Sequence, residues 1–149
     1  MHTNEKEKLR QFYCDTWQKH LDQKPLSELE QQITAVVKEH PEYHQLLENK
    51  EASVGANYLP EMGETNPFLH MGMHLGLREQ ISTNRPHGIA ELYQRLVALK
   101  GVSDAEHAMM ECLGEMIWLA QQSQTQPDEI SYLNCLGKLV ESKPKGNLQ

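Results

Sequence analysis

The chain has 149 residues, which is the size of one domain with a buried core. It carries 14 Lys and Arg against 21 Asp and Glu, a net charge of −7, and no basic stripe, so we expect no nucleic-acid partner. No segment approaches the roughly 20 apolar residues that a membrane helix needs, and the polar N-terminus has no apolar signal core. These features exclude a membrane-spanning protein and favour a cytoplasmic location.

The three cysteines lie far apart, at positions 14, 112 and 135, and form no Cys-x-x-Cys motif. This spacing indicates neither a disulfide framework nor a thiolate zinc site, and it is typical of a reducing compartment. Cys112 lies on the apolar stripe of its predicted helix, so we expect an inert buried thiol there.

The first half of the chain predicts two helices and a loop. The first helix runs from about Glu5 to Asp22. The second begins at Ser27, which forms a capping-box pattern with Glu30, and it ends near His40 because the following proline disfavours helical geometry. A short helical turn can restart over Pro41 to Leu47. Residues 49–66 show no periodicity and predict a long irregular loop, a type of segment that is often functional.

The second half of the chain is predicted to form four more helices. The third helix of the chain, over 67–81, is capped by Asn66 and is apolar on nearly every side, as in a buried helix. A fourth helix over 89–100 stops at Gly101. A second capping-box pattern, Ser103 with Glu106, opens a fifth that reaches about 122, and a sixth runs over about 127–139. The tail at about 141–149 is expected to fray. We therefore predict an all-α fold: residues 1–149 as a single-domain helical bundle of about five to six helices.

Two pairs of histidines have the spacing of metal ligands. Residues four apart on a helix lie about 5–6 Å apart on one face, so their imidazoles can bind one ion, as in the HExxH zinc motif. His70 and His74 have this spacing in HMGMH, and His40 and His44 have it in HPEYH. Pro41 interrupts the second pair. The alternative for both pairs is a set of imidazoles that simply hydrogen-bond within the core.

A third pair combines an imidazole with a carboxylate, which suits Fe, Zn or Mn. His107 and Glu111 are four apart, and Glu115 follows one turn later. The apolar stripe of this helix lies on the opposite side, so a solvated polar face is an equally good interpretation. Trp118 shares their side, which favours cover by another helix or a second subunit. The roles of Glu79 and Glu115, as ligands or as supporting groups, stay open.

These segments carry a resemblance to a known family. The string NPFLHMGMHLGLREQ, with HPEYH before it and EHAMMECLGEMIW after it, resembles the uncharacterised bacterial family named domain of unknown function 1841, from about residue 9 to residue 139. The resemblance implies a small bacterial cytoplasmic protein and supplies no activity. A fainter likeness in ligand pattern links the chain to hemerythrin-like di-iron bundles and to DinB-like bundles with three histidine ligands, although the order of the pairs differs. Such analogy does not license a function.

The leading functional prediction is a metal-binding helical bundle that holds one or two ions of iron or zinc. The predicted ligands are His70, His74, His107, Glu111, His44 and His40. Two ions would suggest oxygen or peroxide chemistry or sensing, whereas one ion with an open position would activate water. The sequence leaves open whether the protein is an enzyme. The alternatives are a non-catalytic interaction protein, in which the histidines stabilise the bundle or a homodimer interface, and a pH-responsive switch.

Overall fold

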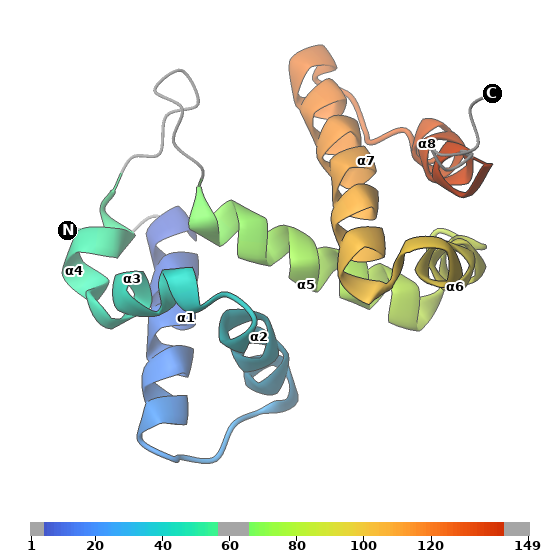
Figure 1. Ribbon diagram of the computed structural model, residues 1–149. Coiled ribbons are helices and arrows are strands. Elements are labelled where there is room, and N and C mark those ends of the chain that lie inside the picture. Colours follow the sequence, from blue (N-terminus) through green and yellow to red (C-terminus); the bar gives the residue numbers. More distant parts are fainter. Residues whose placement is uncertain (1–4, 57–65, 142–149) are drawn as a thin grey trace. The chain divides into compact units, whose positions relative to one another are not determined.

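The computed structural model describes residues 5–56 and 66–141, and this part of the chain is helical, with no strand (Figure 1). Its elements are α1 (Glu5–Leu21), α2 (Glu28–Lys38), the 3-10 helix η1 (Pro41–Tyr43), α3 (His44–Glu48), α4 (Lys50–Val54), α5 (Pro67–Thr83), α6 (Ile89–Lys100), α7 (Val102–Ser123) and α8 (Glu129–Glu141). The all-α class is confirmed. The predicted number of five to six helices is wrong, because these residues form eight α-helices. The additional α3 and α4 are each too short to give a periodic apolar pattern.

The chain divides into two compact units, residues 1–75 and 76–149, and α5 contributes to both. The predicted single domain over residues 1–149 therefore stays a prediction, and each unit is described by itself below. Among the residues that the structure describes, no helix has the length and apolar character needed to cross a membrane.

The core of the first unit lies between α1, α2 and the short helices α3 and α4. Burying each large apolar side chain stabilises the fold by about 1.5–3 kcal/mol, so these contacts decide which faces turn inward. The buried set consists of Tyr13, Cys14, Trp17, Ile33, Val36, Val37, Leu47, Val54, Phe68 and Met71. The buried face of α1 lies at the centre of the helix, while Leu9 and Leu21 near its ends are exposed.

A buried arginine fixes the end of α4 and the start of α5 against α1. Arg10 on α1 is only 3% exposed, and its Nη1 donates hydrogen bonds to the carbonyl oxygens of Val54 (3.0 Å) and Ala56 (2.7 Å). The same guanidinium lies 5.1 Å from the ring centroid of Phe68 in the first turn of α5. A charge buried in this way must be fully satisfied, so Arg10 sets where α5 enters the unit.

The cap positions explain where two helices begin. Ser27 and Glu30 form both bonds of a capping box at the start of α2, and Asn66 accepts hydrogen bonds from the backbone N–H groups of Phe68 and Leu69 at the start of α5. Both predicted caps are confirmed. The Ser103 cap is wrong, because α7 already begins at Val102.

The residue before α7 is Gly101, which has a φ of 87° and makes no side-chain cap. One glycine with this positive φ ends α6 and starts α7, which leaves Ser103 inside the first turn.

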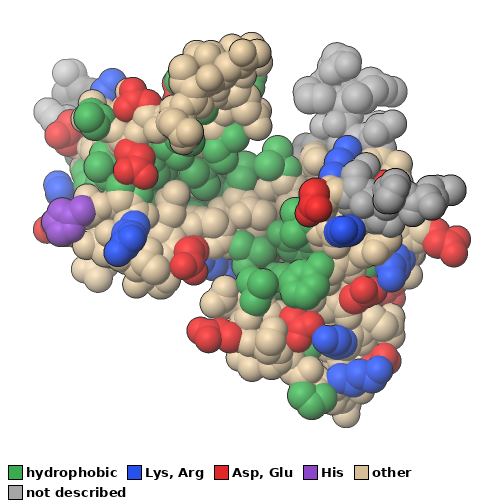
Figure 2. Space-filling model, turned by 180° about the vertical axis from the view of Figure 1, so that it is seen from behind, with side chains coloured by type: hydrophobic (Ala, Val, Ile, Leu, Met, Phe, Trp, Pro, Cys, Tyr) green, Lys and Arg blue, Asp and Glu red, His purple; other side chains and the backbone are tan. Residues whose placement is uncertain are grey.

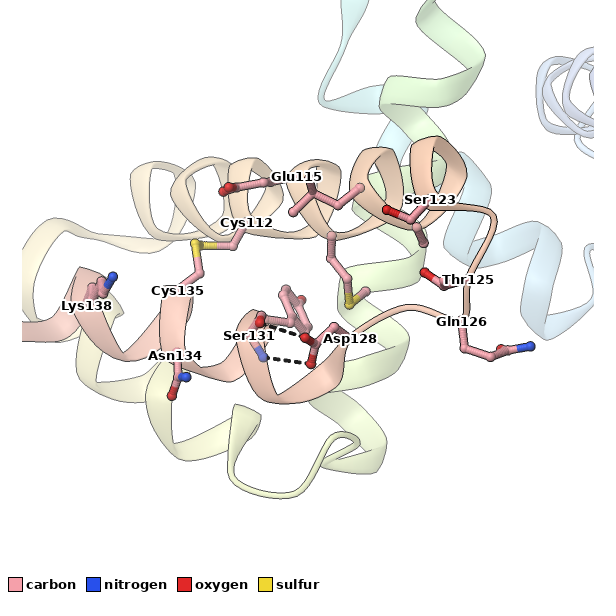
Figure 3. A pocket seen from close by; sticks show the side chains of 14 residues that line it. Cys112, Glu115, Ser123, Thr125, Gln126, Asp128, Ser131, Asn134, Cys135 and Lys138 are labelled. Atoms are coloured by element: carbon pink, nitrogen blue, oxygen red, sulfur yellow. Dashed lines mark hydrogen bonds between the residues drawn. A yellow bond between two sulfur atoms is a disulfide. The ribbon is translucent and has the colours of Figure 1, made fainter.

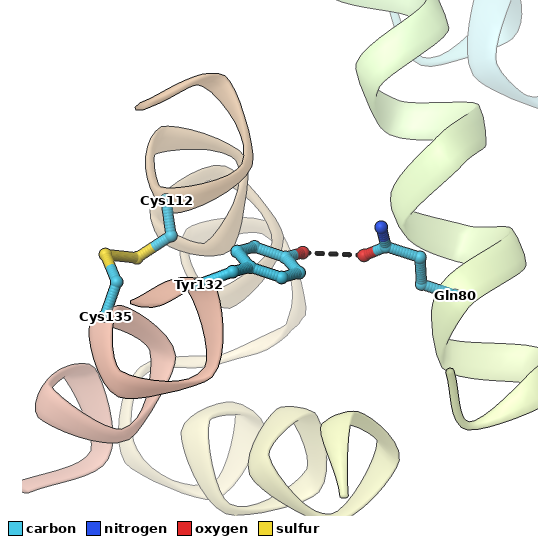
Figure 4. The surroundings of a disulfide bond; sticks show 4 residues. All are labelled: Gln80, Cys112, Tyr132 and Cys135. Atoms are coloured by element: carbon cyan, nitrogen blue, oxygen red, sulfur yellow. Dashed lines mark hydrogen bonds between the residues drawn. A yellow bond between two sulfur atoms is a disulfide. The ribbon is translucent and has the colours of Figure 1, made fainter. Parts of the chain in front are cut away.

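The second unit is built from the end of α5 and from α6, α7 and α8, the last three of which contact one another. Leu77, Ile89, Leu96, Met109, Tyr132 and Leu136 are its most deeply buried large side chains. A disulfide bond between Cys112 of α7 and Cys135 of α8 links two of these helices (Figure 4).

This disulfide corrects the prediction that the cysteines form none and that Cys112 is an inert thiol. The short connection after α7 folds α8 back so that the Cα atoms of the two cysteines lie 5.9 Å apart, although 23 residues separate them in the chain. Sequence spacing alone cannot show such a pairing. The cysteine pattern therefore no longer argues for a reducing compartment.

Three further predictions concern segments around these units. Helix α4 lies inside the segment 49–66, for which the sequence predicts an irregular loop; residues 57–65 of that loop lie outside the described residues. The predicted frayed tail at 141–149 also falls outside them, apart from Glu141 at the end of α8. Helix α5 is buried at Met71 and Leu77, as predicted, but Leu69 is 56% exposed.

Candidate metal centre

Three histidines of the first unit meet beside α5. His70 and His74 lie one turn apart on this helix, and His40 directly precedes η1. Each offers one ring nitrogen, and these nitrogens all lie within 4.8 Å of one another. His74 is 2% exposed and His40 7% exposed, while His70 is partly buried. Among the side chains of the first unit, the cluster therefore brings together three of the six predicted ligands.

The two α5 histidines point their Nε2 atoms at each other. The Nε2–Nε2 distance is 3.2 Å, and the ring planes are 73° apart. In the neutral state one ring must donate its proton and the other must accept it. Two nitrogens bound to one tetrahedral zinc at about 2.0–2.1 Å are about 3.3–3.4 Å apart. The observed separation thus matches the spacing of two imidazole ligands on a common ion.

The third ring is held in place by a backbone hydrogen bond. The Nδ1 atom of His40 donates to the carbonyl oxygen of Val36 at 2.8 Å, which makes Nε2 the nitrogen with the lone pair. The centroid of this ring lies 4.7 Å from that of His74 and 5.2 Å from that of His70. Metal-binding histidines typically donate their other N–H to a carbonyl in this way, which fixes the tautomer and the ring orientation.

Tyr43 forms an aromatic wall beside the cluster. Its ring stacks on that of His40, with centroids 5.5 Å apart and planes 7° apart, and meets the ring of His70 edge-on at 6.2 Å. Burial, and to a smaller extent the charge of Glu42, raise the pKa of the Tyr43 phenol, so the group stays neutral at physiological pH. Sequence reasoning missed this residue, although HPEYH places it three positions after His40.

The structure places His44 away from this group. Its Nε2 donates to the carbonyl oxygen of Val37 at 2.8 Å, and its ring packs against Trp17 with a centroid distance of 4.5 Å. The break at Pro41 that the sequence indicates is the physical reason, because η1 and α3 replace the continuous helix that would align His44 with His40. The geometry of His44 is that of a core histidine satisfied by its neighbours.

The other predicted ligands belong to the second unit. His107 and Glu111 on α7 are exposed, and His107 Nδ1 donates to the carbonyl oxygen of Ser103 at 2.9 Å. Glu115 is exposed on the same helix, and Trp118 is 57% exposed. That His107 and Glu111 bind metal stays a prediction.

The chemistry of the cluster follows from its donor atoms. Imidazole nitrogens suit Zn²⁺, Fe²⁺, Cu²⁺ and Ni²⁺, whereas Mg²⁺ and Ca²⁺ prefer the oxygen ligands that this group lacks. Burial of three polar rings is costly unless they bind one another or an ion. An ion bound by all three would replace the proton now shared between His70 and His74.

The comparisons with known proteins place the chain in a family. Residues 5–138 match the family described as "Domain of unknown function (DUF1841)", and the chain belongs to it. No curated protein and no solved structure matches the chain. The family assignment confirms the resemblance carried by HMGMH and its flanking segments and brings no activity with it. The likeness to hemerythrin-like and DinB-like bundles gains no support from these comparisons.

Proposed function

We propose that the first unit binds a single zinc or iron(II) ion through His40, His70 and His74. The observation that carries this proposal is the 3.2 Å approach of two imidazole Nε2 atoms, with a third imidazole oriented beside them by its bond to Val36. Side chains from α5 and from the start of η1 supply the ligands, so the site depends on tertiary folding and not on one helix alone.

One ion fits the cluster better than two. Di-metal centres of oxygen or peroxide chemistry in helical bundles use several carboxylates, and the group formed here consists of histidines. Three protein ligands are the number that catalytic zinc sites use, and they leave a position for water or a further ligand. That His107 and Glu111 of the second unit bind metal stays a separate prediction and is not part of this proposal. An open position would make the ion a water activator, whereas a fourth protein ligand would make it structural.

Metal content tests the proposal first. The protein is expressed without an affinity tag in metal-supplemented medium, and its zinc and iron are measured by inductively coupled plasma mass spectrometry. We expect about one ion per chain, because a nanomolar site stays occupied through purification. Less than about 0.2 ion per chain, together with no heat of binding on titration with Zn²⁺ or with anaerobic Fe²⁺, contradicts the proposal.

Three variants locate the ion. His74→Ala abolishes stoichiometric binding while circular dichroism shows whether the helices remain. His87→Ala, at an exposed histidine before α6, is the matched control and leaves metal content unchanged. His44→Ala lowers thermal stability without loss of metal, because its ring packs on Trp17. Loss of metal in His44→Ala alone would assign the ligand to the sequence-predicted HPEYH pair instead.

Cobalt(II) reports how the coordination is completed. Its visible absorption is intense in four-coordinate sites and weak in six-coordinate ones, so it distinguishes a compact nitrogen site from a loosely hydrated ion. We expect four-coordinate bands in the wild type. His74→Ala should abolish these bands. Weak six-coordinate bands in the wild type would contradict a compact site built from three imidazoles.

A second candidate function is a non-catalytic interaction protein, and exposed apolar side chains favour it. Trp118 on α7 is 57% exposed and Ile130 on α8 is 75% exposed. Figure 2 shows hydrophobic side chains at the surface among acidic and basic ones. Under this proposal the protein forms homodimers in analytical ultracentrifugation, and Trp118→Ser with Ile130→Ser makes it monomeric. Zn²⁺ then has no effect on stability, and His74→Ala acts only through packing.

A further inference from the structure

The disulfide of the second unit forms part of a cavity wall. Between α7 and α8 lies a cavity of about 670 Å³, a size typical of small-molecule sites. Cys112 and Cys135 lie at one end, and the loop with Thr125 and Gln126 closes the other (Figure 3). The S–S bond is thus reachable from a space that can hold a small molecule.

The two sulfur-bearing residues differ in access. Cys112 is 3% exposed on the inner side of α7, whereas Cys135 is only partly buried on α8. Thiol–disulfide exchange requires in-line approach of a thiolate to one sulfur, so access decides which sulfur is attacked. A nucleophile that enters the cavity therefore reaches Cys135, and Cys112 is the leaving group.

The other cavity-lining side chains suit a polar ligand. Ser131, Asn134 and Lys138 of α8 and Glu115 of α7 supply hydrogen-bonding and charged groups, while Met116 and Leu119 give apolar contact. This mixture fits a low-molecular-weight amino-acid or peptide thiol, which carries amide, carboxylate and ammonium groups on a short chain. A protein thiol on a folded surface would not enter such a space.

We propose that Cys135 is a thiol-exchange and S-thiolation site for small amino-acid or peptide thiols. This site is independent of the metal centre proposed for the first unit. In the first step the thiolate of the small molecule attacks Sγ of Cys135, a new S–S bond forms there, and the Cys112–Cys135 bond breaks. Its electron pair passes to Cys112, which takes up a proton.

A second small thiolate then attacks the outer sulfur of the mixed disulfide, releases the oxidised small-molecule disulfide and leaves Cys135 as a thiolate. The small thiol supplies both electrons.

The second unit keeps attachments for α8 when the disulfide opens. Tyr132, one turn before Cys135, donates a hydrogen bond from its hydroxyl to Gln80 Oε1 at 2.6 Å (Figure 4), and Leu136 is buried. These contacts do not involve sulfur. The reduced and S-thiolated forms therefore retain α8 against its neighbours, and the exchange is reversible without global unfolding.

Variants that retain only one cysteine of the pair test whether Cys135 reacts faster than Cys112. In a Cys14→Ser background, the variants Cys112→Ser and Cys135→Ser each retain one thiol of the pair. We expect Cys135 to react with oxidised glutathione at least about tenfold faster than Cys112, because the exposed thiolate is the reactive one. Mass spectrometry follows the added glutathione, and circular dichroism shows that both variants are folded. Equal rates, or faster reaction of Cys112, overturn the assignment.

The wild-type chain supplies a test that needs no variant. The oxidised protein is incubated with reduced glutathione, quenched with acid, alkylated and mapped by peptide mass spectrometry. We expect glutathione on Cys135 and alkylation of Cys112 in the same molecules. A disulfide that opens only in denaturant, or glutathione found on Cys112, contradicts the proposal. So does a chain in which positions 112 and 135 stay free thiols after exposure to oxidised glutathione.

Discussion

The two units of this chain hold their candidate functional side chains together in different ways. The first unit gathers His40, His70 and His74 with no covalent link, so the geometry of the cluster depends on packing and hydrogen bonds. The second unit joins Cys112 to Cys135 by a bond. Each unit should therefore respond to its own chemical agent: metal should act on the first and a thiol reductant on the second.

The three cysteines illustrate the same contrast. Cys14 in the first unit is 3% exposed and lies 3.6 Å from the hydroxyl of Ser53. Burial is the main reason that the pKa of its thiol is raised, so it stays protonated and unreactive. Cys112 is equally buried, yet it has a partner sulfur on α8. At equal burial, the presence of a partner sulfur on a neighbouring helix is what distinguishes Cys112 from Cys14.

The largest expected effect comes from breaking the disulfide. Its removal should lower the free energy of unfolding of the second unit by about 3 kcal/mol, because a loop of this length restricts the unfolded chain. Hydrogen–deuterium exchange followed by mass spectrometry measures this in α7 and α8 after treatment with a phosphine reductant. Exchange in α1 and α2 is the internal control and should not change. Faster exchange in all helices would show that the two units unfold together.

Metal binding should stabilise the first unit, just as the disulfide stabilises the second. At a concentration 100 times its dissociation constant, Zn²⁺ should stabilise the first unit by about 2.7 kcal/mol, since it binds only the folded state. Fluorescence of Trp17, isolated by Trp118→Phe, reports unfolding of this unit from the core. The His74→Ala chain should show no zinc-dependent shift. A zinc effect that persists in this variant would place the ion elsewhere.

The helices were predictable where the local sequence alone decides the structure. Ser27 and Asn66 cap α2 and α5 as predicted, because each cap depends on residues only two or three positions away. The short helices α3 and α4 were not predictable, since five residues give no period and their burial against α1 is a tertiary effect. Ser103 shows the limit of a local pattern, because the conformation of Gly101 had already started α7.

The candidate site was predictable along one helix and not between elements. The spacing of His70 and His74 alone predicts that their imidazoles meet. His40 joins them and His44 does not, and this choice depends on how the chain turns at Pro41 and how Trp17 packs. The disulfide escaped prediction for the same reason, because the fold of α7 against α8 brings together sulfurs that the sequence leaves far apart.

Each unit contains one Ser-x-x-Glu pattern, and replacing its serine by alanine should change the free energy of unfolding by a smaller amount. The pattern that forms no cap serves as the matched control. Ser27→Ala should lower the free energy of unfolding of the first unit by about 1 kcal/mol, because it removes the acceptor for the Glu30 backbone N–H. Ser103→Ala should change the second unit by less than about 0.5 kcal/mol, because Ser103 caps nothing. Urea denaturation of both variants measures the difference. Equal losses would mean that Ser103 caps α7 in solution.

The smallest effect is an acid response at the start of α8. The backbone N–H and the hydroxyl of Ser131, with the N–H of Ile130, bind the Asp128 carboxylate and lower its pKa below the ordinary value of 3.8. A carboxylate with a depressed folded-state pKa contributes stability that is complete above its unfolded-state pKa and is lost as the pH falls through the folded-state value.

Protection of the first turn of α8 against hydrogen exchange, corrected for intrinsic rates, should therefore be constant above about pH 5 and should fall as the pH drops through the folded-state pKa, which lies below 3.8. Asp128→Asn keeps a capping oxygen but cannot titrate, so its protection should stay flat over this range. The start of α2 supplies the comparison in the other unit. There the hydrogen bond from Lys19, followed by the backbone bond from Ser27, lowers the pKa of Glu30, so α2 should keep its acid response in Asp128→Asn. If Asp128→Asn also flattens the response of α2, one titration controls both units and their independence fails.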